Sequence, residues 1–258
     1  MPIHQTARTF GARRVPATTA ASGCWQLGEV TQARRAGIWP STDDPLFSDV
    51  TLLLAMDGTN GSTTFVDDSN SSLSFTASGN AQISTAESKF GGASGLFDGT
   101  GDYIESDTTT GAMQFGTGDF TVEAWVYLDS TASEGVIQQT PTTAPSCYCS
   151  VDSTAVRVGR HGAGQYSGAS NTLSTATWHH VAWVRASGTI YIFFDGVSQS
   201  VSDASGGVGS YDFSGERTVV VGKVGALDFD GHIDSLRVTK AARYTANFTP
   251  PSGAFPTS

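Results

Sequence analysis

Hydrophobic and polar residues alternate most clearly between positions 120 and 128. One set of alternate positions holds Phe120, Val122, Ala124, Val126 and Leu128, and the other holds Thr121, Glu123, Trp125 and Tyr127. Successive side chains of a strand point to opposite faces, and here both faces carry large apolar residues. The pattern therefore predicts a strand that is central to a β-sandwich and buried on both sides.

Shorter apolar runs predict further strands at 50–56, 190–194, 197–201, 219–221 and 233–238. Asp195-Gly196 lies between two of these runs and is a strong hairpin signal. Helical periodicity is hard to find beyond residue 40. We therefore expect an all-β sandwich. Its predicted core includes Phe97, Phe120, Trp125, Trp183, Phe193, Phe194, Ile233 and Leu236, each worth roughly 1.5–3 kcal/mol when buried.

The first 48 residues differ from the rest. Residues 1–22 are rich in Arg, Ala, Thr and Pro, residues 23–40 allow one or two helical turns, and residues 41–48 read as a linker. Trp25 and Trp39 would be costly to leave in solvent. We therefore expect this segment to pack either on its own sandwich or on a neighbouring protein. The prediction is an extended anchoring arm and linker over 1–48 and a sandwich over 49–258. The expected anchoring residues are Arg13, Arg14, Trp25, Arg34, Arg35 and Trp39.

Charge is distributed unevenly between these two parts. The chain carries a net charge of −10. Residues 1–48 hold five arginines against Glu29, Asp43 and Asp44, a net of +2, so the remainder has a net of −12. An acidic body repels phosphates, which argues against nucleic acid as the main partner. The basic start suits docking on an acidic protein surface, or it is simply a solvated arm.

The cysteines do not suggest a disulfide framework. Cys24, Cys147 and Cys149 are an odd, sparse set, and the Cys-x-Cys pair lacks the second pair of a zinc site. We expect three free thiols. Residues 1–5 lack the apolar stretch of a secretory signal, and no apolar run approaches the roughly 18 residues that cross a bilayer. These features predict a protein made in a cytosol, without membrane insertion.

A series of motifs occurs in a consistent order over roughly residues 50–250. The motifs lie at 88–92 (SKFGG), 96–103 (LFDGTGDY), 115–126 (FGTGDFTVEAWV), 178–181 (WHHV), 195–196 (DG) and 229–237 (FDGHIDSLR). Together they resemble the laminin-G-like, concanavalin A-like lectin/glucanase jelly-roll family. The resemblance implies a concanavalin A-like jelly-roll β-sandwich with an extended N-terminal arm.

Two more segments narrow the resemblance. The ending at 242–251 (ARYTANFTPP) is similar to the C-termini of such domains in bacteriophage structural proteins, and 23–40 is similar to short leaders before them. This implies a non-catalytic virion protein, assembled in the host bacterial cytoplasm: a tail fibre, a tail-associated adhesin or a capsid decoration protein. Its expected partners are other virion proteins, reached through the arm, and a host-surface glycan. We expect a homo-oligomer or a multi-copy arrangement.

Catalytic patterns are incomplete. Glycosidases of this fold use a cluster resembling E-x-D-x-x-E, and the nearest match, Glu105 with Asp107, lacks the third carboxylate. His179 and His180 should point to opposite faces of a strand and cannot easily chelate one metal. No G-x-S-x-G elbow is present. The alternative to the non-catalytic role is a bacterial carbohydrate-binding module or a glycoside hydrolase of the same fold.

Two kinds of binding site remain. The resemblance implies a calcium ion at a sheet rim, held by Asp57, Asp234 and Asp68, or Asp67 in place of Asp68, with backbone carbonyls near Gly99 completing the shell. The alternative is that Asp57 and Asp234 cap turns or pair with Arg237.

A glycan site needs an aromatic platform and polar loop residues. The loops at 160–166 and 211–213 supply His161, Tyr166, Tyr211 and Asp212. The alternative is that these side chains serve packing.

Overall fold

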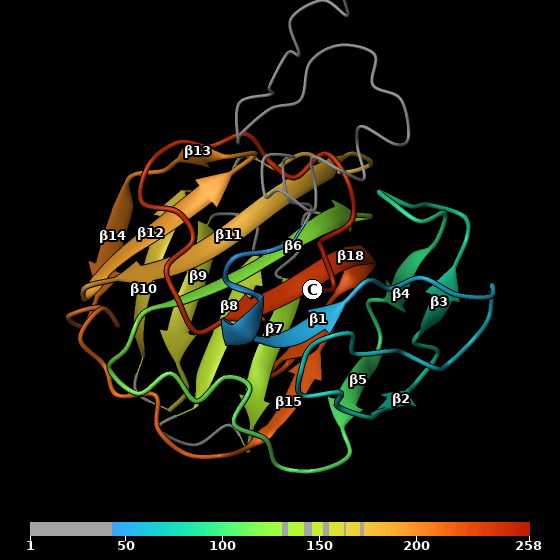
Figure 1. Ribbon diagram of the computed structural model, residues 1–258, viewed down its shortest axis with the longest axis horizontal. Coiled ribbons are helices and arrows are strands. Elements are labelled where there is room, and N and C mark those ends of the chain that lie inside the picture. Colours follow the sequence, from blue (N-terminus) through green and yellow to red (C-terminus); the bar gives the residue numbers. More distant parts are fainter. Residues whose placement is uncertain (1–42, 131–133, 142–145, 152–154, 163, 171–172) are drawn as a thin grey trace, which may run out of the picture. The chain divides into compact units, whose positions relative to one another are not determined.

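Two antiparallel sheets packed face to face make up the computed structural model, as the alternation predicts (Figure 1). The structure describes residues 43–130, 134–141, 146–151, 155–162, 164–170 and 173–258. Pro45–Thr257 form one compact unit, which is the sandwich. The six predicted anchoring residues and Cys24 lie outside the described residues.

The first sheet has the strand order β13-β12-β11-β6-β18-β4-β3, and β1 also pairs with β18. Its strands are β1 (Val50–Leu54), β3 (Gln82–Ser84), β4 (Ser94–Asp98), β6 (Phe120–Leu128), β11 (Trp178–Ala186), β12 (Thr189–Phe194), β13 (Val197–Ser198) and β18 (Asp230–Thr239). Figure 1 looks onto this sheet, with the other behind it.

The second sheet has the order β14-β10-β9-β8-β7-β15-β5-β2. Its strands are β2 (Phe75–Ser78), β5 (Tyr103–Ser106), β7 (Glu134–Thr140), β8 (Cys147–Val151), β9 (Ala155–Arg160), β10 (Gln165–Ser170), β14 (Val201–Ala204) and β15 (Thr218–Val221). A small hairpin of β16 (Lys223–Val224) and β17 (Leu227–Asp228) and a 3-10 turn, η1 (Phe47–Asp49), complete the described elements. Among these residues there is no helix with the length and apolarity that crossing a membrane requires.

The core lies between the sheets. All eight predicted core residues are buried, including Trp183 with no exposed surface and Trp125 with 5%. Trp125 and Phe193 face away from the main core, however. Phe90 and Lys89 cover Trp125, and Phe193 belongs to a separate cluster with residues of the C-terminal segment. Cys147 and Cys149 are free and buried in the main core.

The predicted hairpin after β12 is confirmed. Asp195 and Gly196 have φ values of 47° and 77°, as a type I′ turn requires. The predicted single returning strand at 197–201 is wrong. The strand that pairs with β12 ends at Ser198, apart from one backbone hydrogen bond from Gln199 to Ile192, and Val201 begins β14 at the edge of the second sheet. Ser198, Gln199 and Ser200 offer nothing apolar to bury against the first sheet.

Strand β18 changes partners at a bulge. Its first half pairs with β4 and its second half with β1, while its register with β6 shifts between Asp234 and Arg237. Ser235 in the bulge has a φ of 48°. The first and last strands of the sandwich therefore lie side by side.

The C-terminal segment covers part of the outer face of the first sheet. Tyr244 and Phe248 stack with ring centroids 3.6 Å apart, and both rings pack on Phe193. Phe255 lies 3.8 Å from the guanidinium of Arg237. The chain itself therefore occupies the part of this face around Phe193 and Arg237, while Tyr127 and Trp178 on the same face stay partly exposed. The outer face of the second sheet is a further surface for a partner.

Candidate glycan-binding face

The outer face of the second sheet is defined by alternation. Cys149, Val158 and Ala169 belong to the core, so their neighbours along each strand point the other way. The pairing registers align one residue from each strand in a row across the whole sheet. The row is Thr76, Glu105, Val220, Gln138, Tyr148, Gly159, Tyr166 and Ala204. We call this surface the row face.

Aromatic and cationic side chains gather at one end of the row face. The Tyr148 ring lies over Gly159, where a Cβ atom would come within 2.2 Å of Cζ of the ring. The Arg157 guanidinium lies 5.0 Å from the centre of the Tyr166 ring, and His161 contacts Tyr148 with ring centroids 4.8 Å apart. Partly exposed rings beside a guanidinium are the groups that stack on sugars and bond to their hydroxyls.

Protonation at this end is set by burial. Burial raises the pKa of Tyr148 to about 12, although the charge of Arg157 opposes the shift. The phenol is therefore a neutral hydrogen-bond donor and acceptor at physiological pH. Burial also lowers the pKa of His161, which favours its neutral imidazole.

The other end of the row face carries a fixed carboxylate. Glu105 Oε1 accepts hydrogen bonds from the hydroxyls of Thr218 at 2.7 Å and Thr140 at 3.1 Å. Asp107, two residues on, accepts a bond from the Thr76 hydroxyl at 2.6 Å. Between the two ends, the β16–β17 hairpin lies on β7, with the Gly225 N–H donating to Gln138 Oε1. The face is thus divided into an aromatic end and an acidic end.

The structure separates the four residues that the sequence predicted for glycan binding. His161 and Tyr166 both lie at the aromatic end. Tyr211 instead packs between Arg160, 4.2 Å from its ring centre, and Phe213. Asp212 follows it in the same loop.

Arg185 explains the position of that loop. It is fully buried and donates to the carbonyls of Gly116, Gly118 and Tyr211, each at 2.7 Å. Burial lowers its pKa, while the charges of Asp119 and Asp212, among others, act in the opposite direction. Tyr211 and Asp212 therefore take part in holding this loop. Tyr148 and Arg157, which sequence reasoning missed, lie at the aromatic end instead.

The three carboxylates predicted for calcium are neighbours. Asp234 Oδ2 accepts the backbone N–H groups of Lys89 and Phe90, at 2.8 and 3.0 Å, and Oδ1 accepts the Ser235 hydroxyl. Burial raises the pKa of Asp234 to about 6, and the charge of Asp57 adds to that rise. Burial also raises the pKa of Asp57, as does the charge of Asp68.

This arrangement is a chain of mutually repelling carboxylates. Within the described ranges, no group of three or more His, Cys, Asp or Glu side chains is placed to hold a metal ion. Hydrogen bonds also use both oxygens of Asp234. The three side chains alone therefore do not fit a calcium site, which would need backbone carbonyls and water as further ligands. Arg237, the alternative partner, pairs with Glu123 instead.

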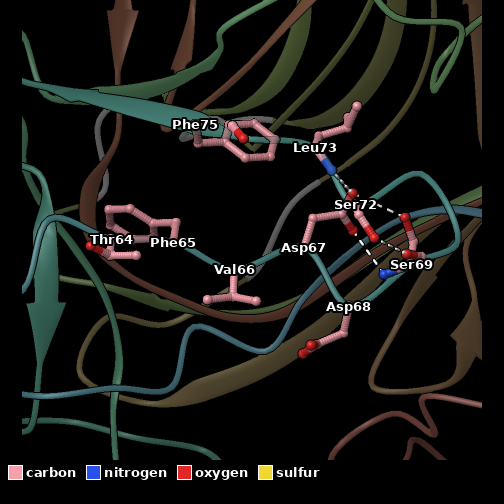
Figure 2. Close-up of a pocket in the computed structure, with 10 residues that line it drawn as sticks. Thr64, Phe65, Val66, Asp67, Asp68, Ser69, Ser72, Leu73 and Phe75 are labelled. Carbon is pink, nitrogen blue, oxygen red and sulfur yellow. Dashed lines mark hydrogen bonds between the residues drawn. The ribbon is translucent and has the colours of Figure 1, made fainter.

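A cavity of about 590 Å³ opens beside the loop at 64–75 (Figure 2). Asp67 organises this loop by accepting bonds from the N–H groups of Leu53, Ser69 and Leu73 and from the Ser69 hydroxyl. Figure 2 shows the Asp68 side chain turned away from this network. Asp67 is therefore committed to the loop. The cavity is lined by Ser and Thr side chains and, in equal number, by the apolar residues Phe65, Val66, Leu73 and Phe75, together with Asp67 and Asp68.

Comparison with known proteins identifies the fold. A family model described as the concanavalin A-like lectin/glucanases superfamily matches residues 98–247. No curated protein sequence matches the chain.

Solved structures with a similar fold include the binding domain of botulinum neurotoxin DC in complex with SialylT, with 10% identity and a TM-score of 0.54 over 77% of this chain and 50% of that one. A Trypanosoma rangeli sialidase has 14% identity and a TM-score of 0.54, over 81% of this chain and 32% of that one. This chain thus spans half or less of these structures. At such identities the likeness shows a shared fold and leaves the activity open.

Proposed function

Because the chain belongs to the concanavalin A-like lectin/glucanase superfamily, we propose that it is a glycan-binding structural protein of a bacteriophage virion. The sandwich presents the row face outward, and residues 1–48 fix it to the particle as a tail fibre, a tail-associated adhesin or a capsid decoration protein. The observation that carries the glycan part is the aromatic end, where two tyrosines, a histidine and an arginine lie on one face.

The difference between the outer faces of the two sheets supports this proposal. The C-terminal segment packs on part of the outer face of the first sheet, whereas the aromatic end of the second sheet has partly exposed rings that can meet a ligand. The similarity of residues 23–40 and 242–251 to segments of phage structural proteins supports the virion setting. Many copies on one particle make weak single contacts sufficient, because multivalency raises avidity by roughly 10²–10⁴.

The glycan part is tested on an array of bacterial surface polysaccharides and sialylated oligosaccharides. We expect the wild-type chain to bind a subset of them. Tyr166→Ala should reduce that signal at least tenfold without lowering the melting temperature, and Val197→Ala, at an exposed position of the first sheet, should match the wild type. Absence of binding to every glycan, or equal binding by Tyr166→Ala, would remove the proposal.

The virion part is tested by the copy number of the chain in purified particles of the phage that encodes it. Gel densitometry against the major capsid protein gives hundreds of copies for a decoration protein and few for a tail fibre. Finding the chain free in lysate and absent from particles would contradict both assignments.

Hydrolysis is the second candidate function, because Glu105 lies on the same face as the aromatic end. Reducing-sugar release from a polysaccharide panel tests it. Release that disappears in Glu105→Gln would establish a glycoside hydrolase, whereas our proposal predicts no release.

Calcium remains a prediction tied to Asp57, Asp68 and Asp234. Neutralising the repulsion among these carboxylates would stabilise the fold, by about 2.7 kcal/mol when the ion is at 100 times its dissociation constant. Melting curves with CaCl₂ and with MgCl₂ test the prediction. A rise with CaCl₂ that Asp57→Asn removes supports it, and superimposable curves would reject it.

A further inference from the structure

Three polar side chains from separate elements form a hydrogen-bonded chain at the rim of the sandwich. Ser174 lies between β10 and β11, His179 lies near the start of β11, and Asp195 lies in the turn after β12. Ser174 Oγ is 3.0 Å from His179 Nε2, and His179 Nδ1 is 2.9 Å from Asp195 Oδ2. A hydroxyl, an imidazole and a carboxylate in this order have the geometry of a serine nucleophile with its base.

The carboxylate is held independently of the other two members. Asp195 has a φ of 47° in the hairpin turn, and its Oδ1 accepts the His180 N–H at 2.8 Å. The Asp195 N–H in turn donates to the His180 carbonyl at 2.8 Å. Backbone pairing of β11 with β12 therefore aims the remaining oxygen, Oδ2, at His179.

The position of Asp195 Oδ2 determines which nitrogen of the His179 imidazole carries the proton. An ionised carboxylate can only accept hydrogen bonds, so His179 Nδ1 carries the proton that faces Asp195. In the neutral ring, Nε2 then has a free lone pair, and the contact at 3.0 Å is the Ser174 hydroxyl donating to it. His179 is thereby positioned as the base for Ser174.

The exposure of the three groups suits an attack on an outside molecule. Ser174 is exposed, whereas the His179 side chain is only 15% exposed and the Asp195 side chain is 48% exposed. The nucleophile can be reached while the base is largely sheltered from water. A nucleophile on an open rim reaches groups that project from a larger molecule.

We propose that Ser174, His179 and Asp195 form an acyl-transfer site for O-acyl esters, such as acetyl esters of exposed hydroxyl groups. Ser174 Oγ attacks the ester carbonyl carbon as its proton passes to His179 Nε2. The C–O bond to the alcohol breaks, and the alcohol leaves with that proton. Water, giving a proton to the same nitrogen, then attacks the carbonyl carbon of the Ser174 ester. The bond from that carbon to Ser174 Oγ breaks, Oγ takes the proton back from His179 Nε2, and the carboxylic acid is released. This activity goes beyond glycan binding and does not depend on it.

The test uses two probes of different size on the full chain. A fluorophosphonate should add one adduct per molecule, located at Ser174 by peptide mass spectrometry, and p-nitrophenyl acetate should be hydrolysed catalytically. Ser174→Ala should abolish both signals. Ser71→Ala, at another exposed serine, is the matched control and should behave as the wild type.

The Asp195→Asn variant tests whether Ser174 reacts because His179 activates it or only because Ser174 is exposed. Asparagine tolerates the positive φ and still accepts the His180 N–H, so the turn should hold and the melting temperature should stay within about 2 °C of the wild-type value. Its amide reverses the tautomer of His179, which should slow both reactions roughly 10²–10⁴-fold. Failure of both probes to react with the wild-type chain, or equal rates for wild type and Asp195→Asn, would overturn the proposal. Loss of glycan binding alone would leave it standing.

Discussion

At the residue scale, Glu123 illustrates a buried charge that its partners keep ionised. Its side chain has no exposed surface, and Oε1 accepts hydrogen bonds from Nε and Nη2 of Arg237 at 2.9 and 2.7 Å. The Tyr244 hydroxyl donates to Oε2 at 3.0 Å, and His180 Nε2 lies 3.2 Å from it. Burial alone would raise the pKa of Glu123, but Arg237 and His180 outweigh burial and lower it to about 2.

Replacing Glu123 by Gln should therefore be costly. The change leaves the Arg237 charge buried without its partner, and breaking a buried pair in this way costs about 3–5 kcal/mol. Urea denaturation at pH 7 measures the loss. Thr76→Ala, which removes an exposed hydrogen bond to Asp107, is the control and should cost less than about 1 kcal/mol. A loss below that value for Glu123→Gln would contradict our description of the cluster.

The raised pKa of Glu134 predicts an unusual pH dependence of the stability of the fold. Burial raises its pKa from 4.5 to about 7, although hydrogen bonds from the Asp230 N–H and the Ser130 hydroxyl oppose the shift. Because the folded state holds this proton more tightly than the unfolded state, stability should increase as pH falls from about 7 to 4.5. Asp234, with its pKa of about 6, acts in the same direction. Glu123, whose pKa is lowered, makes stability decrease as pH falls, but only below about pH 4.5.

Glu134→Gln tests this origin. The amide imitates the protonated carboxyl group, so the variant should be more stable than the wild type at pH 8, on the order of 1–2 kcal/mol after allowance for solvent screening. The gain should vanish at pH 5. Urea denaturation at both pH values is the measurement, and an equal effect at the two values would refute the assignment.

At the element scale, strands with strong alternation or a continuous apolar run could be predicted, and the short polar strands could not. The stretch 120–128 matches β6 to the residue, and Asp195-Gly196 forms the expected turn. The strands β7 to β10 carry short polar and glycine-containing sequences, so alternation gave no signal there. The bulge at Ser235 depends on β18 having two different partners along its length, which no local pattern encodes.

The candidate site residues could not be grouped from local sequence patterns either, because strand pairing brings them together. Tyr148 and Arg157 meet Tyr166 through the pairing of β8, β9 and β10, so the aromatic end became visible only with the register. Ser174 and Asp195 contact His179 from separate elements, so neither could be assigned from the sequence alone. His179 and His180 point to opposite faces, as alternation requires.

The β16–β17 hairpin provides a prediction at this scale. At Gly135 in β7, a Cβ atom would lie 2.1 Å from the Val224 backbone nitrogen and 2.5 Å from the Leu227 carbonyl oxygen. Backbone atoms cannot move aside cheaply, so Gly135→Ala should displace the hairpin and cost roughly 1–3 kcal/mol. Gly253→Ala, where a Cβ would meet no atom within 4 Å, is the matched control. Equal melting temperatures for both variants would show that the hairpin does not lie on β7.

At the scale of the whole sandwich, the outer faces of the two sheets are covered by different parts of the chain. The C-terminal segment closes the first sheet over the Glu123 cluster, with Tyr244 contacting both Phe193 and Glu123. On the second sheet, the β16–β17 hairpin lies over the middle of the row face, and the aromatic end keeps partly exposed rings. The first sheet thus carries the packing of the C-terminal segment, and the second sheet carries the surface proposed for glycan binding.

The most direct test of the account is hydrogen–deuterium exchange with and without a glycan found on the array. We predict that the bound glycan slows exchange in peptides from β8, β9 and β10, around Tyr148, Arg157 and Tyr166. Peptides from β11, β12 and β18 of the first sheet should exchange at unchanged rates. Protection confined to the first sheet, with β8–β10 unaffected, would contradict the assignment of the second sheet as the binding surface.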